Sequence, residues 1–194
     1  VIIEDPIEYI HTNKKSIIKQ REVYSDTYSF EESLKRTLRQ DPNVIVIGEM
    51  RDLETISTAL TASETGHLVL ATLHTSNASA SIDRIIDVFP SHQQSQIRIQ
   101  LADTLQGIIS QQLLPMVEGK GRVLAYEVLV STSAIRNLVR ERKSSEIITY
   151  MQTGQQYGMK PMDVSLKELY ENGSISYELA RSRMRSPEEF KKYY

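Results

Sequence analysis

The fold is decided by residues 44–52, which read Val44-Ile45-Val46-Ile47-Gly48-Glu49-Met50-Arg51-Asp52. The apolar run is too short for most helices and is rich in Val and Ile. Runs of this kind are typical of parallel strands, which are buried on both faces. In open α/β sheets, ligands bind beyond the carboxyl ends of the strands. The stretch therefore predicts a buried strand over 44–48 that presents the carboxylate of Glu49 at a ligand site.

Two further segments have the same pattern of an apolar run followed by polar side chains. Residues 1–3 form an apolar run that precedes three carboxylates, and residues 68–73 form an apolar run that precedes an imidazole. The side chains that follow the two runs are those of Glu4, Asp5, Glu8 and His74. Like Glu49, they are expected at the carboxyl ends of strands. This arrangement is typical of half of a nucleotide-hydrolysing site.

Helix signals alternate with these runs. Ser29 and Glu32 form a capping box, in which a hydroxyl and a carboxylate each satisfy a free backbone donor. Asp52 caps a second helix, and Gly66 ends it as a left-handed residue. Helices are expected over 30–40, 53–65 and 77–88, and a loosely alternating edge hairpin over 16–24. The alternation of strands and helices indicates right-handed crossovers and a mostly parallel sheet.

The pattern changes in the second half of the chain. A capping box formed by Ser91 and Gln94 opens a further helix. The apolar face of this helix is expected to comprise Leu101, Leu105, Ile108 and Ile109. A strand is expected over 122–130, and helices follow over 132–142, 144–153, 163–172, 176–184 and 187–193. The predicted fold class is α/β, with a core over 1–131 and a small all-helical C-terminal subdomain over 132–194.

Composition narrows the class of protein. The 194 residues are 40% hydrophobic and 25% charged, as in ordinary globular proteins, and the formal net charge is −2. This charge gives no general attraction to nucleic acid or to an anionic membrane. No apolar run approaches the roughly 18 residues of a membrane span. The absence of cysteine excludes disulfides and thiolate metal sites. We expect neither a nucleic-acid partner nor direct membrane insertion.

The three strand-end segments resemble the Asp box, the Walker B box and the His box of the type II/IV secretion ATPase superfamily. The resemblance is greatest to its branch of type IV pilus retraction ATPases, which serve twitching motility. It continues through residues 48–55 and through two further segments, Gln20-Arg21-Glu22-Val23 and Ala134-Ile135-Arg136-Asn137-Leu138. The resemblance implies a RecA-like P-loop NTPase core that uses ATP and Mg²⁺.

One motif of the superfamily is not found in this sequence. It is the Gly-rich Walker A loop, which ends in Gly-Lys-Ser or Gly-Lys-Thr. Position 1 is Val rather than Met, and the chain opens directly on a predicted strand. We therefore expect a C-terminal fragment of a longer ATPase. The fragment is expected to be inactive alone, because the backbone amides and Lys of that loop cradle the β- and γ-phosphates.

By resemblance, three residues carry catalysis. Glu8 would orient or deprotonate the attacking water, Glu49 would hold Mg²⁺ through its water shell, and His74 would sense the γ-phosphate. Gly48 takes the position of the Asp in the generic Walker B motif, as it does in this superfamily, so Glu49 carries the role alone. The residues by themselves do not rank Glu8 above Glu4.

Four further residues are assigned to nucleotide binding, namely Glu4, Asp5, His67 and Arg51. Glu4 and Asp5 would brace the loop and the outer shell of the metal. His67 and His74 flank one predicted strand and are expected roughly 20 Å apart, so they cannot share one metal ion or phosphate. A subunit contact is the alternative role for His67.

Residues 134–138, here named the retraction motif, look like the segment that marks the retraction branch. Ile135, Leu138 and Val139 follow the spacing of an apolar stripe on a helix. Core packing explains this stripe as well as a role in retraction does. Both interpretations remain open from the sequence.

The resemblance implies a homo-hexameric motor that drives pilus retraction. Its partner would be the inner-membrane platform protein of the type IV pilus, and its location would be cytoplasmic, peripherally associated with that machinery. A pilus-assembly or type II secretion ATPase is the first alternative. It is disfavoured because such relatives commonly carry a tetracysteine zinc motif. A non-catalytic module that docks on a pilus machine is the second alternative.

Overall fold

The computed structural model describes residues 1–117, 119 and 121–190. Contacts divide the chain into two compact units. Unit 1 comprises Val1–His74 and Arg84–Thr104, and unit 2 comprises Thr75–Asp83 and Leu105–Tyr194. The chain therefore first passes from unit 1 to unit 2 directly after His74.

Unit 1 is built on a parallel sheet with the strand order β2-β1-β3-β4. The strands are β1 (Ile2–Glu4), β2 (Gln20–Glu22), β3 (Val44–Ile47) and β4 (Leu68–Ala71). Val46 lies opposite Ile2 of β1 and Leu70 of β4. The carboxyl ends of these three strands consequently lie at one edge, and the predicted parallel sheet is confirmed.

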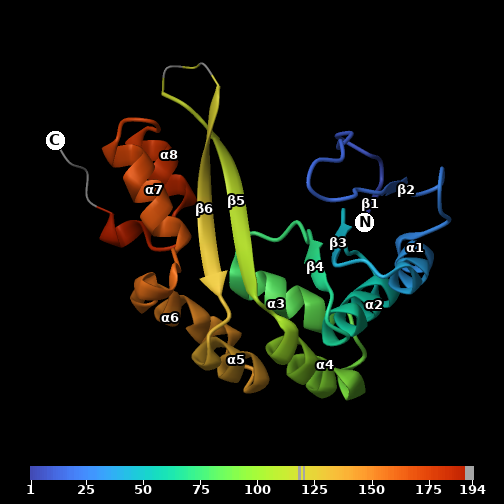
Figure 1. Ribbon diagram of the computed structural model, residues 1–194. Helices are drawn as coiled ribbons and strands as arrows, with labels where there is room; N and C mark the ends of the chain where they lie inside the picture. Colours follow the sequence, from blue (N-terminus) through green and yellow to red (C-terminus); the bar gives the residue numbers. More distant parts are fainter. Residues whose placement is uncertain (118, 120, 191–194) are drawn as a thin grey trace. The chain divides into compact units, whose positions relative to one another are not determined.

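Helices α1 (Phe30–Thr37), with its extension η1 (Leu38–Gln40), and α2 (Leu53–Glu64) pack on one face of this sheet (Figure 1). The shared core consists of Ile3, Val23, Leu34, Ile45, Ile47, Ala59 and Ala62. Successive side chains of a strand point to opposite faces. On the face away from α1 and α2, Leu68 and Leu70 are 48% and 49% exposed. The apolar cover of the sheet in unit 1 is therefore one-sided.

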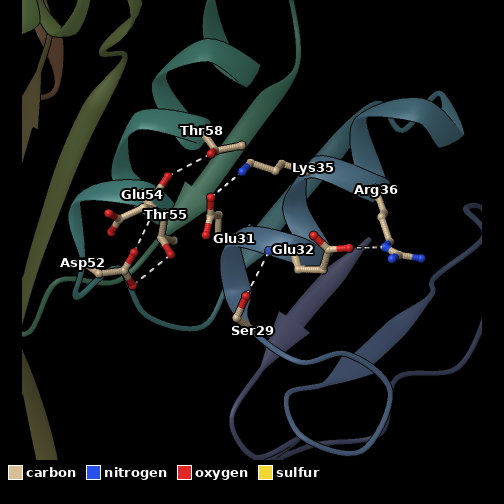
Figure 2. Close-up of polar contacts among 9 residues, drawn as sticks. All are labelled: Ser29, Glu31, Glu32, Lys35, Arg36, Asp52, Glu54, Thr55 and Thr58. Atoms are coloured by element: carbon tan, nitrogen blue, oxygen red, sulfur yellow. Dashed lines mark hydrogen bonds and ion pairs between the residues drawn. The ribbon is translucent and has the colours of Figure 1, made fainter.

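The N-termini of α1 and α2 are capped by the residues that the sequence predicts (Figure 2). Ser29 Oγ accepts from the Glu32 N–H at 3.1 Å, and Asp52 Oδ1 accepts from the Thr55 N–H at 2.8 Å. The carboxylate of Glu32 does not complete the expected capping box but pairs with Arg36 at 2.6 Å. Arg36 lies one helical turn further on, within easy reach of that carboxylate.

Helix α4 (Ser91–Thr104) packs against α2. Its Gln100 Nε2 donates to the Glu64 carboxylate at 3.2 Å. Ser91, expected to precede the helix as its cap, is instead its first residue. Gln94 Nε2 donates to the Phe89 carbonyl at 3.0 Å. This side chain therefore satisfies a backbone acceptor that lies before the helix.

The edge hairpin predicted over 16–24 is wrong. Strand β2 covers only Gln20–Glu22 and pairs with β1 in parallel. The connection over residues 5–19 is long enough for a parallel return, and the Gln20 Nε2 group holds it by donating to the Tyr9 carbonyl at 2.7 Å. The alternation in this segment indicated a strand but carried no information about its direction.

The helix predicted to continue through Ile108 and Ile109 is also wrong. Both residues lie in β5 (Gly107–Pro115), which pairs antiparallel with β6 (Arg122–Val130) along its whole length. Short apolar spacings fit a helix or a strand equally well. Pairing with the distant β6, which is itself a strand as predicted, decides the outcome.

In unit 2, the β5–β6 pair packs against α7 (Met162–Glu171) (Figure 1). The other elements are α5 (Ser133–Arg140), η2 (Ser144–Glu146), α6 (Ile147–Thr153), η3 (Gln155–Tyr157), α8 (Tyr177–Arg183) and η4 (Pro187–Glu189). Their core contains Leu114, Ala125, Met162, Leu166, Ile175, Ala180 and Phe190. Of the helix predicted over 187–193, residues 191–193 lie outside the described residues. No helix within the described ranges has the length and apolar character that a membrane crossing needs.

Helix α3 (Ala78–Asp87) belongs to both units, because Ala78–Asp83 is part of unit 2 and the rest is part of unit 1. Strands β5 and β6 also group with the C-terminal helices, whereas the sequence predicts that residues 107–130 belong to the core over 1–131. These units are defined by contacts alone. The division into functional domains at 1–131 and 132–194 stays a prediction.

Candidate active site

The predicted site lies in unit 1, at the carboxyl edge of the sheet. Strands β1, β3 and β4 are paired in register up to this edge. The Met50 N–H donates to the Thr72 carbonyl at 3.0 Å, and Thr72 Oγ1 donates to the Gly48 carbonyl at 2.5 Å. The Walker B segment and the His box are therefore tied together directly after their strands end.

Glu49 is the centre of this site. Its Oε2 lies 2.5 Å from Arg51 Nη2 and 3.4 Å from His74 Nε2. The Glu49 side chain is 19% exposed, whereas those of Arg51 and His74 are 74% and 71% exposed. The structure thus brings together three of the predicted site residues, with the carboxylate innermost.

His74 has an unusual backbone conformation. Its φ of 50° lies in the left-handed region, which residues with a Cβ seldom adopt. Such conformations persist where surrounding contacts enforce them, and they are common at functional sites. His74 is in contact with Glu49 and lies two residues after Thr72, which is bonded to the Walker B segment.

A close approach of β1 explains the glycine in the Walker B segment. The Gly48 N–H donates to the Ile3 carbonyl at 2.7 Å. A Cβ at position 48 would lie 3.2 Å from that oxygen and 3.3 Å from the Glu4 Cα. An aspartate at this position would force β1 to shift, so Glu49 is left as the carboxylate that this strand delivers.

The pairing with Arg51 lowers the pKa of Glu49. The hydrogen bond from Arg51 is the largest cause, burial of the carboxyl group acts in the opposite direction, and the charges of Arg51 and His74 add to the lowering. In return, the hydrogen bond to Glu49 raises the pKa of Arg51, and the charge of Asp5 contributes. Asp5 is therefore coupled electrostatically to the same site.

Replacing Arg51 with Ala is expected to raise the pKa of Glu49 toward the ordinary glutamate value of about 4.3. Because the folded pKa is lowered, the pair stabilises the fold above that ordinary value, and its contribution is lost as the pH falls through the folded pKa. The variant should lose this part of the acid dependence of unfolding. Carboxyl NMR titration and urea unfolding across this acid range measure both effects. The control is Arg39→Ala, which changes an exposed arginine of η1, and an unchanged Glu49 pKa in R51A would contradict the pairing.

The Asp box leaves β1 and is braced by β2. Glu4 Oε2 accepts from Gln20 Nε2 at 3.0 Å, and the Ile7 N–H donates to Glu22 Oε2 at 3.0 Å. The role expected for Glu4 at the metal stays a prediction. Gln20 and Glu22 were missed as supporting residues, and the only signal for them was their place in a segment that resembles the family.

Glu8 lies on the same loop and is exposed, as is Asp5. The ion pairs that Glu49 forms are with Arg51 and His74. The role of Glu8 in activating water therefore stays a prediction, and so does its ranking over Glu4.

His67 lies before the amino end of β4, at the opposite end of the strand from His74. Its Nδ1 is 3.0 Å from the Ala62 carbonyl oxygen and 3.1 Å from Thr65 Oγ1. The ring therefore caps the C-terminal end of α2. Its assignment to nucleotide binding stays a prediction, as does the alternative of a subunit contact.

The retraction motif forms most of α5, which Thr132 caps by accepting from the Ile135 N–H at 3.5 Å. Ile135 and Leu138 are only 0% and 6% exposed. Asn137 is exposed, and the side chains of Ala134 and Arg136 are partly buried. The motif therefore has an apolar face that packs in unit 2 and a polar face that solvent reaches.

The residues at the sheet edge fit a magnesium site only in combination with phosphate. Among residues 1–117, 119 and 121–190, no group of three or more His, Asp or Glu side chains could hold a metal ion by itself. Mg²⁺ is usually bound by one or two carboxylates together with substrate phosphates and waters. The innermost carboxylate of the site, Glu49, suits that pattern.

Comparison with known proteins defines the class. Residues 1–176 match the family of type II/IV secretion system proteins, and the chain belongs to this family. It is 50% identical over 188 residues to the type IV pilus retractation ATPase PilT of Pseudomonas aeruginosa, an overlap of 97% of this chain and 54% of the relative. It is also 50% identical over 186 residues to a twitching motility protein of Neisseria gonorrhoeae, covering 96% of this chain and 50% of that protein.

A solved structure gives the same result for the fold. The crystal structure of the pilus retraction motor PilT with bound ADP superposes with a TM-score of 0.88 at 53% identity, over 97% of this chain and 53% of that chain. Together with the parallel sheet, this similarity confirms the predicted RecA-like core. The chain spans about half the length of the curated relatives named above.

Proposed function

We propose that the protein containing this chain is an ATP-hydrolysing motor that drives retraction of type IV pili. The observation that carries the proposal is the contact of Glu49 with Arg51 and His74 at the carboxyl edge of a RecA-like sheet. Phosphoryl transfer to water requires an oriented water and compensation of charge on the phosphates. A carboxylate, a guanidinium and an imidazole at one strand edge are suited to these tasks.

Each site residue has a task in this proposal. Glu49 would hold Mg²⁺, which would supply charge neutralisation at the phosphates when bound. His74 contacts the γ-phosphate from the end of the neighbouring strand. Glu8 orients or deprotonates the attacking water, while Glu4 and Asp5 keep the loop in place.

Arg51 has two tasks in the same scheme. It neutralises Glu49 through the 2.5 Å contact described above. Its exposed guanidinium is also suited to donate to phosphate oxygens. His67 completes the proposed nucleotide-binding set, with the subunit contact as its alternative.

The assembly and location are part of the proposal. The motor works as a homo-hexamer on the cytoplasmic side of the inner membrane, where it binds the platform protein of the pilus machine peripherally. The similarity to a type IV pilus retractation ATPase and to a twitching motility protein supports a pilus role. The polar face of the retraction motif is the surface that we assign to partner contact.

The purified 194-residue chain is expected to release negligible phosphate from Mg-ATP, whereas the complete gene product is expected to hydrolyse it. No segment of the 194 residues can replace the backbone amides and Lys of a P-loop. A phosphate-release assay of both preparations, cleared of contaminating ATPases, tests this expectation. Equal turnover by the two preparations would contradict the expected dependence on a P-loop.

The phosphate-release assay and the phenotype of a deletion strain together separate the retraction motor from the docking module and the assembly ATPase. A complete gene product without turnover would favour the non-catalytic docking module. With turnover established, a strain that lacks the gene should keep its pili and lose twitching. Loss of the pili themselves would favour an assembly ATPase.

A further inference from the structure

Glu127 on β6 is a buried carboxylate outside the site already described, and it is 4% exposed. Its Oε1 accepts from the Ala78 N–H at 2.8 Å, and its Oε2 accepts from the Met162 N–H at 3.4 Å. Ala78 and Met162 are the first residues of α3 and α7. The first N–H groups of a helix have no partner within the helix, and negative charge is favoured there. One side chain therefore caps two helices from a third element.

Two further bonds hold the first half of α3 to the C-terminal helices of unit 2. Ser79 Oγ donates to the Ser144 carbonyl at 2.9 Å, and Ser144 Oγ donates to Asp83 Oδ2 at 3.1 Å. Ser144 is the first residue of η2, which leads into α6. Together with Glu127, these bonds fix α3 from its first residue to the point where the chain returns to unit 1.

The start of α3 is close in sequence to the candidate active site. Only residues 75–77 separate His74 from Ala78. Thr75 Oγ1 is 2.5 Å from Ser81 Oγ, and Asn77 Oδ1 accepts from the Ala80 N–H at 2.9 Å. The connecting residues are thus bonded to the first turn of α3, so a displacement of that turn acts on the backbone that directly follows His74.

We infer that Glu127 is a positioning residue for the active site. By fixing the start of α3 on β6 and α7, it restrains residues 75–77 and, through this covalent connection, the backbone at His74, without touching nucleotide. The inference rests on the proposed function, because the site that Glu127 positions is the site of ATP hydrolysis.

The test compares Glu127→Gln with a matched variant in the complete gene product. A glutamine keeps one acceptor but presents an N–H group to the second backbone donor. The control is Ser165→Ala. Ser165 is 2% exposed and its Oγ accepts from the Tyr126 N–H at 3.1 Å, so this variant removes a buried bond between β6 and α7 but leaves α3 untouched.

E127Q is expected to lower kcat for ATP hydrolysis on the order of tenfold or more, while KM changes by less than about twofold. Hydrogen exchange at amides 75–83 should become faster in the same variant. S165A should lower Tm to a similar degree and leave both kcat and these amides unchanged. Should E127Q fail to fold, Ser144→Ala serves in its place, because it removes only the hydroxyl bond to Asp83. This variant is expected to lower kcat less strongly, again with little change in KM.

The outcomes separate this inference from the proposed function. A parent protein without ATPase activity would overturn the proposed function and the inference with it. An active parent in which E127Q and S165A lose kcat equally at equal Tm would overturn the inference alone. Glu127 would then be a structural cap.

Discussion

Replacing Glu49 with Gln in the complete gene product is expected to lower ATP turnover by roughly 10²-fold or more while the fold stays intact. Glutamine keeps the shape of the side chain but removes the charge that pairs with Arg51 and that we propose to hold Mg²⁺. The side chain is only 19% exposed and sits at the centre of the site, so solvent cannot replace that charge. Steady-state turnover and circular dichroism of the variant measure the two parts of this expectation.

Two further variants test whether the loss of turnover is specific to Glu49. Glu54→Gln changes an exposed carboxylate in the first turn of α2 and should leave turnover unchanged. Glu8→Gln should lose turnover as Glu49→Gln does, yet keep more nucleotide affinity because only Glu49 is assigned to the metal. Equal loss of nucleotide affinity in both variants would show that the two roles are wrongly divided.

Replacing Ile135 with Ala is expected to lower the free energy of unfolding by about 2–5 kcal/mol. Ile135 is 0% exposed, so the truncation leaves a cavity in unit 2 that its neighbours cannot fill. Stability and ATPase activity should therefore fall together. Thermal melts and ATPase rates of the purified variant measure this parallel loss, and a stable I135A would contradict the packing role.

The polar face of the retraction motif supplies the contrasting variant. Asn137→Ala changes an exposed side chain and should alter stability by no more than about 0.5 kcal/mol. If the motif contacts a partner, this variant keeps its ATPase activity and impairs twitching. Normal twitching by N137A would indicate that the retraction motif serves only to pack unit 2.

The elements that the sequence predicts correctly are those with a local cause. Strands β1, β3 and β4 each follow from an apolar run with a polar residue at its end, and Asp52 caps α2 because its carboxylate reaches a backbone N–H three residues on. Strands β2 and β5 were misread because a strand's partner and direction are set by residues far away in the chain. Ile108 and Ile109 have a spacing that suits a helix, and only pairing with β6 makes them part of a strand.

The same distinction holds for the candidate site. Glu49 and His74 meet because parallel register brings strand ends together, which a sequence pattern can indicate. The choice of Arg51 as the ion-pair partner of Glu49 depends on side-chain conformations that no pattern contains. Glu127 gave no signal, because the two N–H groups that it accepts from lie 49 and 35 residues away along the chain.

The one-sided cover of the sheet in unit 1 has a consequence for the chain in solution. Within the described residues β4 is the last strand of its sheet, and Leu68 and Leu70 on it are about half exposed. Edge strands with apolar, uncharged faces recruit strands from other molecules. We therefore expect the 194-residue chain to aggregate as its concentration rises, and we expect Leu70→Lys to reduce this aggregation. Low solubility of this polypeptide would then reflect a surface left without cover and not a failure to fold.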